Sequence, residues 1–241
     1  MEAKVTQEHY SVLDHGYVRF VERWGGDETI IEAARMSTSK GFQGWGAAGH
    51  DPRCPNFGDR LPRFPKACDA CERFEGDEAL LRYLYEHKHM TPFEMGGLTL
   101  EVQAPIFVFR EWHRHRTQSY NELSARYTEL PDLFYVPSDD RVLLGKQATS
   151  NKQSSEAATF TQDEREAIRH QIRIAQEESR RAYERLLALG VAREIARVVI
   201  PVGQYSRMRA SANLRNWLAF LTLRMDPAAQ WEIRQFAIAV G

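Results

Sequence analysis

Thirteen consecutive residues hold the side chains best suited to chemistry: Arg114-His115-Arg116-Thr117-Gln118-Ser119-Tyr120-Asn121-Glu122-Leu123-Ser124-Ala125-Arg126. Arginines this close together repel one another unless anions neutralise them, and their planar guanidinium groups suit phosphate oxygens. The stretch therefore indicates binding of a phosphate or a pyrophosphate. Asn121, Glu122 and the hydroxyl groups are then available to recognise the polar edges of a base or a sugar.

On residue types alone, two other interpretations of this stretch stay open. It could be a solvated basic helix end, or it could be a surface that binds nucleic acid. Against nucleic acid, the basic residues lie among aromatic ones, and the whole chain has a formal net charge of only −1.

A metal site is a weaker candidate. His50, Cys54, Cys68 and Cys71 could bind zinc, because Cys68 and Cys71 have the C-x2-C spacing of a zinc knuckle. Only one such pair exists, so reduced thiols in an irregular insertion, with no metal, are the favoured interpretation. The glycine pattern of residues 44–49 resembles a dinucleotide fingerprint, but neither a strand before it nor a helix after it is expected.

Composition restricts the class of protein. The chain has 241 residues, 43% of them hydrophobic and 27% charged, which is typical of a globular protein. No apolar run approaches the roughly 18 residues of a membrane span. Residues 1–7 lack the pattern of a secretory signal, so we expect a cytoplasmic protein.

The first half of the chain predicts strands and short helices around one irregular segment. Alternating residues over 10–25 favour a strand or hairpin, and Asp27 is placed to cap a helix that runs to about Met36. Residues 40–76 are rich in glycine and proline and predict an irregular, cysteine-containing insertion. A helix over 77–88, a strand over 98–102 and a helix beginning at Pro105 follow.

The second half predicts helices. The sequence from Thr161 to Glu164 resembles a capping box that opens a long helix, which Gly190 ends. Its expected buried face is formed by apolar residues at helical spacing: Ile168, Ile172, Ala175, Ala182, Leu186 and Leu189. Helices are also expected over 193–199 and 213–223, and a last one opened by Asp226 and Pro227. Strands followed by helices favour a single α+β domain over residues 1–241.

The chain resembles the flavin-dependent thymidylate synthases. Residues 114–126 match the signature R-H-R-x-x-S-x-N-E-x-S-x-R of that family at every fixed position. Residues 87–94 resemble its H-x-H-x-T-P-F-E element, and residues 104–108 resemble the helix start that follows. Residues 193–197, 213–215, 223–224 and 230–232 also fit, so the resemblance covers about 10–240 except the insertion.

The resemblance implies an activity. Members of the family reductively methylate dUMP to dTMP, with methylenetetrahydrofolate as carbon donor, NADPH as reductant and FAD as hydride carrier, and without a covalent enzyme nucleophile. It also implies an antiparallel sheet with packed helices, a homotetramer with sites between subunits, and no requirement for nucleic acid. Two alternatives stay open: C5-methylation or hydroxymethylation of another uracil nucleotide such as UMP, and an RNA-binding protein without catalysis.

The resemblance also implies site residues, position by position. Those expected to bind FAD are Thr91, Arg114, His115, Arg116, Asn121, Glu122, Asn213 and Arg215. Those expected to bind dUMP are Glu111, Arg114, Glu122, Ser124, Arg126, Arg197 and Arg224, with Ser124, Arg126 and Arg197 at the phosphate and Glu194 orienting Arg197. Arg224, His89 and Ser124 are the expected catalytic residues: Arg224 faces the uracil, and His89 lines the folate and flavin side.

Three positions depart from the family pattern. Glu111 stands where many members have glutamine, and Ala219 and Ala228 replace asparagine and histidine. A carboxylate near a nucleotide phosphate is costly unless an arginine or a proton compensates it.

Overall fold

The computed structural model describes residues 9–45, 49–50, 54–55, 73–74, 76–147 and 155–241. They form two compact units. The first unit contains the described parts of Met1–Glu22, Thr99–Ala212 and Asn216–Gly241, and the second contains those of Arg23–Leu98 and Asn213–Arg215. The expectation of one domain over the whole chain stays a prediction.

A five-stranded antiparallel sheet is the framework of the fold, in the order β1-β2-β5-β9-β6. Its strands are β1 (Tyr10–Val12), β2 (Gly16–Trp24), β5 (Gly97–Pro105), β6 (Ser119–Glu122) and β9 (Tyr205–Asn213). The expected hairpin is confirmed, with Val12 paired to Gly16. A side chain at Gly16 would lie 2.6 Å from the Val12 carbonyl oxygen, so only glycine fits this turn. The expected α+β class is confirmed as well.

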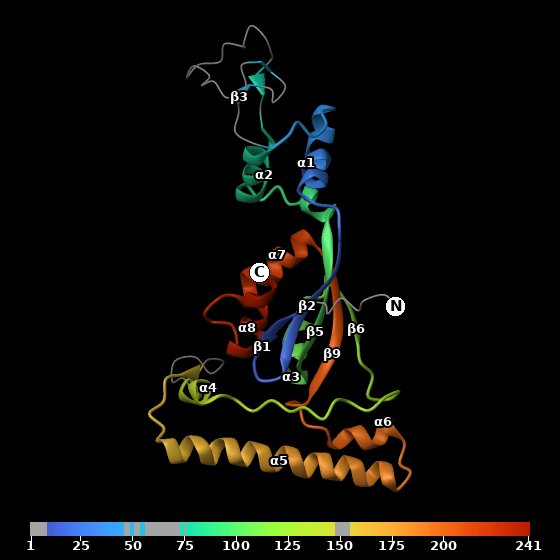
Figure 1. Ribbon diagram of the computed structural model, residues 1–241, viewed down its shortest axis with the longest axis vertical. Helices are drawn as coiled ribbons and strands as arrows, with labels where there is room; N and C mark the ends of the chain where they lie inside the picture. The colour runs from blue at the N-terminus through green and yellow to red at the C-terminus, as the bar shows by residue number, and fades with distance from the viewer. Residues whose placement is uncertain (1–8, 46–48, 51–53, 56–72, 75, 148–154) are drawn as a thin grey trace. The chain divides into compact units, whose positions relative to one another are not determined.

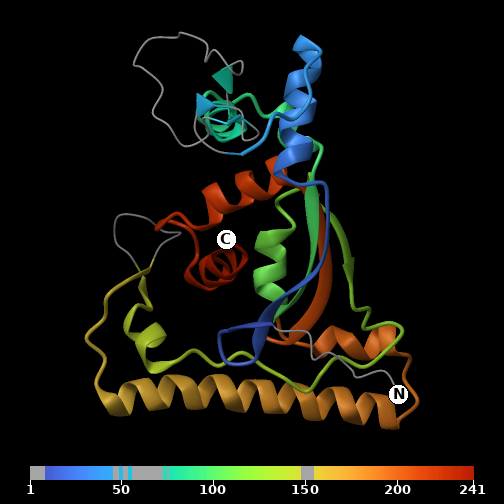
Figure 2. The ribbon, with the colours of Figure 1, turned by 45° about the horizontal axis from the view of Figure 1, so that its top comes forward.

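Three helices lie together on one face of the sheet, as Figure 2 shows: α3 (Ile106–Trp112), α7 (Leu214–Arg224) and α8 (Trp231–Val240). Their contact is an aromatic cluster in which the Trp112 and Phe220 rings stack at 4.5 Å between centroids. Two predicted helix starts were wrong. Pro105 is the last residue of β5 and the N-cap of α3, and α8 begins at Trp231, after a turn, rather than at Asp226.

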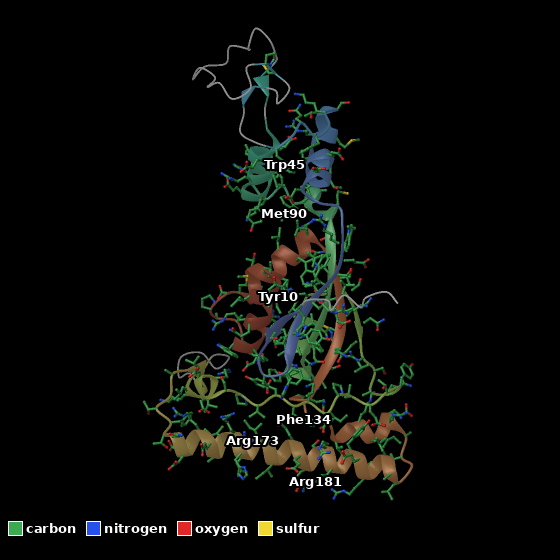
Figure 3. The ribbon with its side chains drawn as sticks, in the orientation of Figure 1. Tyr10, Trp45, Met90, Phe134, Arg173 and Arg181 are labelled. Carbon is green, nitrogen blue, oxygen red and sulfur yellow. The ribbon has the colours of Figure 1, made fainter. Side chains whose placement is uncertain are left out.

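The long helix is α5 (Gln162–Ala188), which lies across one end of the first unit with α6 (Arg193–Ala196) beside its C-terminal half (Figures 1 and 2). The predicted capping box is present, and Gly190 ends the helix with φ of 80°. Of the predicted apolar face, Ile168, Ile172, Ala182 and Leu186 are half-buried, whereas Ala175 and Leu189 are exposed; the buried residues of the helix are Gln176 and Tyr183. Charged side chains such as Arg173 and Arg181 follow its length (Figure 3). No described helix is long and apolar enough to cross a membrane.

Shorter elements complete the first unit: α4 (Asp139–Leu143), β7 (Lys146–Gln147), β8 (Ser155–Glu156) and the 3-10 turn η3 (Arg197–Val199). The turn η3 follows α6 directly, so the expected helix over 193–199 is one short helix continued by a tighter turn.

The second unit is built around a buried carboxylate. It contains α1 (Asp27–Arg35), η1 (Met36–Thr38), β3 (Gly49–His50), β4 (Arg73–Phe74), α2 (Asp77–Glu86) and η2 (Thr91–Glu94). The fully buried Asp77 accepts hydrogen bonds from Arg35 Nε (2.7 Å) and from the Gln43 backbone N–H (2.6 Å). The helix α1 is capped by Gly26, not by Asp27, which is its first helical residue. Within residues 40–76, β3 pairs with β4, and the expectation of an irregular insertion stays a prediction.

Candidate functional site

The arginine-rich stretch forms a tight loop after α3 and then strand β6. The Tyr120 hydroxyl lies 2.7 Å from the His115 carbonyl oxygen and 3.1 Å from that of Trp112. Burial raises the pKa of Tyr120 to about 12, so this hydroxyl keeps its proton and can donate to these carbonyls. The Trp112 indole donates to Gln118 Oε1 at 3.1 Å. These contacts fix the loop at both of its ends.

At the end of α7, Arg224 is held by two residues that precede it by more than a hundred positions. Its Nε donates to His115 Nε2 at 2.9 Å, and one terminal nitrogen donates to Glu111 Oε2 at 2.9 Å. The other terminal nitrogen donates to the Glu111 carbonyl oxygen at 2.7 Å. The whole residue Arg224 is only 9% exposed, so the guanidinium has one fixed orientation.

His115 is neutral in this arrangement. Its Nε2 accepts the hydrogen bond from Arg224, so its ring proton must be on Nδ1. Burial and the positive charge of Arg224 lower the pKa of His115 from 6.5 to about 4, although the Glu111 carboxylate opposes the shift. Geometry and electrostatics therefore agree on an uncharged imidazole near neutral pH.

A pocket of about 620 Å³ opens beside Arg224, and we call it the Arg224 pocket. Its lining consists of Glu111, Arg114, Leu223, Arg224, Asp226, Ala228, Ala229 and Gln230. Arg114 and Arg116 are exposed, and neither side chain has a hydrogen-bond or ion-pair partner in the part of the chain that the structure describes. Arg114 therefore gives this pocket a guanidinium group that can take an anion, and Arg116 follows it by two residues in the chain.

A second pocket, of about 410 Å³, contains another group of the expected residues. We call it the Ser124 pocket; it is lined by Ile106, Arg110, Glu122, Leu123, Ser124, Ala125, Leu130, Arg197, Ile200, Val202 and Ser206. The Glu194 carboxylate lies 3.5 Å from the guanidinium of Arg126, which follows the lining residue Ala125. We expected Glu194 to orient Arg197, so this expectation is corrected: its ion-pair partner is Arg126.

The helix α3 contributes to both pockets through different residues. Ile106 and Arg110 line the Ser124 pocket, whereas Glu111 lines the Arg224 pocket, as does Arg114 just beyond the helix. No residue in the described part of the chain lines both pockets. The structure thus brings the expected dUMP residues together as two separate groups.

Four expected site residues belong to the second unit: His89, Thr91, Asn213 and Arg215. The His89 ring lies 5.8 Å from that of Tyr83, and its backbone N–H donates to the Leu84 carbonyl oxygen at 2.8 Å. Thr91 opens η2, and the Arg215 guanidinium pairs with Glu94 in the same turn. Thr91 therefore lies in a short turn and His89 in the loop before it, whereas Asn213 ends β9 and Arg215 lies in the first turn of α7.

The zinc candidate stays a prediction. Cys68 and Cys71 lie outside the described residues, as does the side chain of His50, and Cys54 is buried. Within the described residues no group of three or more histidine, cysteine or acidic side chains could hold a metal ion.

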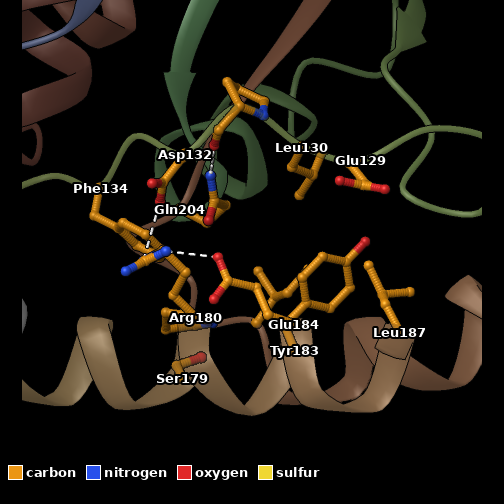
Figure 4. Close-up of a pocket in the computed structure, with 13 residues that line it drawn as sticks. Glu129, Leu130, Asp132, Phe134, Ser179, Arg180, Tyr183, Glu184, Leu187 and Gln204 are labelled. Atoms are coloured by element: carbon orange, nitrogen blue, oxygen red, sulfur yellow. Dashed lines mark hydrogen bonds and ion pairs between the residues drawn. The ribbon is translucent and has the colours of Figure 1, made fainter. Parts of the chain in front are cut away.

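Another cavity, of about 100 Å³, lies between α5 and residues 129–134, and Figure 4 shows it. Arg180 bridges Asp132 (3.6 Å) and Glu184 (2.6 Å) along its wall. The buried Tyr183 hydroxyl has no hydrogen-bond partner among the described residues. None of the expected site residues lines this cavity, and its volume suits a few water molecules.

Comparison with known proteins decides the family. The model of the thymidylate synthase complementing protein family, Thy1, matches residues 19–241. The chain belongs to this family. A flavin-dependent thymidylate synthase of Thermus thermophilus is 40% identical over 95% of this chain and 72% of its own length. One from Thermosipho africanus is 38% identical over 96% of this chain and 87% of its own length.

A solved structure is similar in fold as well. The UMP/dUMP methylase PolB from Streptomyces cacaoi, bound with 5-Br dUMP, matches with a TM-score of 0.72 and 32% identity, covering 95% of this chain and 89% of that one. The resemblance to the flavin-dependent thymidylate synthases, first seen in the signature, is therefore confirmed.

Sequence reasoning missed several residues around these sites of the Thy1 family member. Tyr120 and Gln118 occupy unspecified positions of the signature, although they fix its loop. Arg110 and Ser206 line the Ser124 pocket, yet Arg110 precedes the signature by one helical turn and Ser206 lies far from it in sequence. The arginine spacing of 110 and 114 was the only available signal.

Proposed function

We propose that this chain reductively methylates dUMP to dTMP, with methylenetetrahydrofolate as the carbon donor and NADPH as the reductant. The family match and the relatives that are named flavin-dependent thymidylate synthases support this proposal. The observation in the molecule that carries it is the buried Arg224, fixed by His115 and Glu111 at the wall of an open pocket.

The residues around the Arg224 pocket fit FAD. A dinucleotide presents a pyrophosphate, and Arg114 and Arg116 are exposed, unpaired guanidinium groups within the described chain. We expect the residues that hold FAD to be Thr91, Arg114, His115, Arg116, Asn121, Glu122, Asn213 and Arg215. When bound, FAD supplies the hydride that completes the transferred one-carbon group.

Arg224 acts on the uracil in this proposal. A fixed guanidinium beside the uracil N3 lowers the pKa of the N3–H, because a nearby cation favours the charged form of an acid. The deprotonated ring is richer in electrons at C5, where the new carbon is received. His115 stays neutral and accepts from Arg224, so it orients the guanidinium without adding charge. His89 lines the folate side, and no enzyme nucleophile is required.

The nucleotide phosphate belongs in the Ser124 pocket. Ser124 and Arg197 line it, and Arg126 follows the lining residue Ala125 directly in the chain. The resemblance to the family implies sites between subunits, so one nucleotide would use the Ser124 pocket of one copy and the Arg224 pocket of another; the separate linings of the two pockets are compatible with this. The proposal therefore includes a homotetramer with sites between subunits.

The test is product analysis by mass spectrometry. Purified protein is incubated with FAD, NADPH, methylenetetrahydrofolate and dUMP, and in parallel with UMP. The UMP arm is included because PolB is described as a UMP/dUMP methylase and was also solved with 5-Br UMP. The proposal expects dTMP from dUMP. Methylation of UMP but not of dUMP would mean that the substrate is the ribonucleotide. Bound flavin with no methylated nucleotide from either substrate would overturn the proposal.

A further inference from the structure

The Ser124 pocket contains a second cation that neither the signature nor its resemblance assigns. Arg110 lies on α3 and lines the pocket together with Arg197. Its side chain is exposed, and among the described residues neither of these two guanidinium groups has a hydrogen-bond or ion-pair partner. Unpaired arginines in one pocket repel each other unless a shared anion lies between them.

The charge balance of the lining depends on Arg110. Arg110 and Arg197 each carry a positive charge, and among the described residues of the lining Glu122 alone carries a negative one. The lining is therefore positive with Arg110 and neutral without it. A phosphate monoester carries a charge of about −1.5 to −2 near pH 7, so it needs the second arginine for balance.

A buried hydroxyl is the second observation. Ser206, on β9, also lines the pocket and is 0% exposed. Its Oγ has no hydrogen-bond partner among the described residues. A buried hydroxyl without a partner costs free energy, and a phosphate oxygen in the pocket would accept from it.

We propose that Arg110 and Ser206, with Arg197 and Ser124, bind the monophosphate of the nucleotide, and that Arg110 supplies the charge that makes this pocket specific for a phosphate ester. The inference rests on the proposed function and names the residues of its phosphate site. On α3, Arg110 then serves the phosphate of one nucleotide, and its neighbour Glu111, through Arg224, serves the base of a nucleotide at another site.

The test compares nucleotide with nucleoside. Isothermal titration calorimetry on the flavin-loaded protein measures the affinity for dUMP and for deoxyuridine, which lacks the phosphate. Arg110→Ala should weaken dUMP binding roughly 10- to 100-fold, the range for losing a charge-assisted hydrogen bond, and leave deoxyuridine binding unchanged. Arg110→Lys should fall between, because it keeps the charge and loses the planar fork. Arg173→Ala is the matched control, since Arg173 is an exposed arginine on α5 (Figure 3).

Two results would overturn the inference. One is a dUMP affinity of Arg110→Ala equal to that of Arg173→Ala. The other is an equal loss for dUMP and deoxyuridine, which would mean that Arg110 supports the fold or the base end instead. Thermal melting shows whether each variant is folded. If Arg110→Ala is not, the nucleotide affinities of Arg110→Lys are compared with those of the control instead.

Ser206→Ala gives an independent result. Removing a buried hydroxyl without a partner should leave the melting temperature unchanged or raise it, while dUMP binding weakens several-fold. Unchanged dUMP affinity would remove Ser206 from the site.

Failure of the proposed function can be distinguished from failure of the phosphate site. If wild-type protein makes no dTMP, the same variants are titrated with UMP, dTMP and inorganic phosphate. If the affinity for these phosphates falls in Arg110→Ala, the inference about the phosphate site holds even though the proposed reaction does not. Wild-type binding to none of them would overturn the site itself.

Discussion

In the folded protein the pKa of His115 should lie well below its ordinary value. The free energy of unfolding should therefore depend on pH. In the unfolded chain the imidazole takes a proton near pH 6.5, whereas in the fold its pKa is about 4. Between these values the unfolded state binds more protons than the folded state. The free energy of unfolding therefore falls as the pH falls from about 6.5 to about 4.

The magnitude follows from the size of the shift. Each pKa unit corresponds to about 1.4 kcal/mol, so the shift of His115 sets an upper limit of about 3 kcal/mol. The ring is partly exposed, and solvent screening reduces this to about 1–2 kcal/mol. For a chain of this length that corresponds to a melting temperature lower by roughly 2–8 °C at the acid end of the window.

The assay is urea denaturation of wild type and His115→Gln at several pH values, together with NMR titration of the imidazole. The variant cannot take up a proton in this range, so its stability should depend less steeply on pH. Arg224→Met should raise the pKa of His115 only part of the way to 6.5, because burial is the larger cause of the shift. An imidazole pKa between 6 and 7 in the folded wild type, or equal pH slopes for wild type and His115→Gln, would refute this reasoning.

Three further changes have defined outcomes. Arg224→Ala should slow dTMP formation roughly 100-fold in steady-state assays with flavin still bound, whereas His115→Ala should weaken flavin binding, followed by absorbance. Gly16→Ala should lower the melting temperature by roughly 5 °C, because its Cβ would lie 2.6 Å from a backbone oxygen, while Gly41→Ala, with nothing within 4 Å, is the neutral control. Thr161→Ala should lower it by roughly 2–4 °C through loss of the helix cap.

Each of these has a contradicting result. Loss of flavin in Arg224→Ala with normal flavin in His115→Ala would reverse the two roles. Equal melting curves for the two glycine variants would mean that the tight turn relaxes at no cost. An unchanged melting temperature for Thr161→Ala would show that tertiary contacts alone hold the start of α5.

Local signals predicted the elements that depend on neighbouring residues. The capping box of α5 and the β1–β2 hairpin were found because their determinants lie within a few positions of one another. Strand β9 was missed although its sequence alternates: Met208, Ala210 and Ala212 are buried, and the residues between them are arginine and serine, but alanine and serine have little preference for strands. Burial on the sheet, rather than intrinsic preference, makes that segment a strand.

The candidate site was predictable to the extent that a signature specifies it. The residues of 114–126 were found together, but the contact of Arg224 with His115 joins positions 109 apart, and spacing cannot show it. The division into two pockets also needed the fold, because α3 turns Arg110 and Glu111 to different sides. Helical geometry separates residues that are adjacent in sequence.

The separation of the two pockets by α3 has a consequence for mixtures of variants. If the phosphate is held by one copy and the uracil by another, a chain with Arg197 replaced and a chain with Arg224 replaced are each inactive alone. Mixed after reversible dissociation, they would form some interfaces with both intact groups and regain part of the activity. Complementation of this kind would show that each active site is built from two chains. Dilution below the concentration at which the chains assemble would abolish the regained activity.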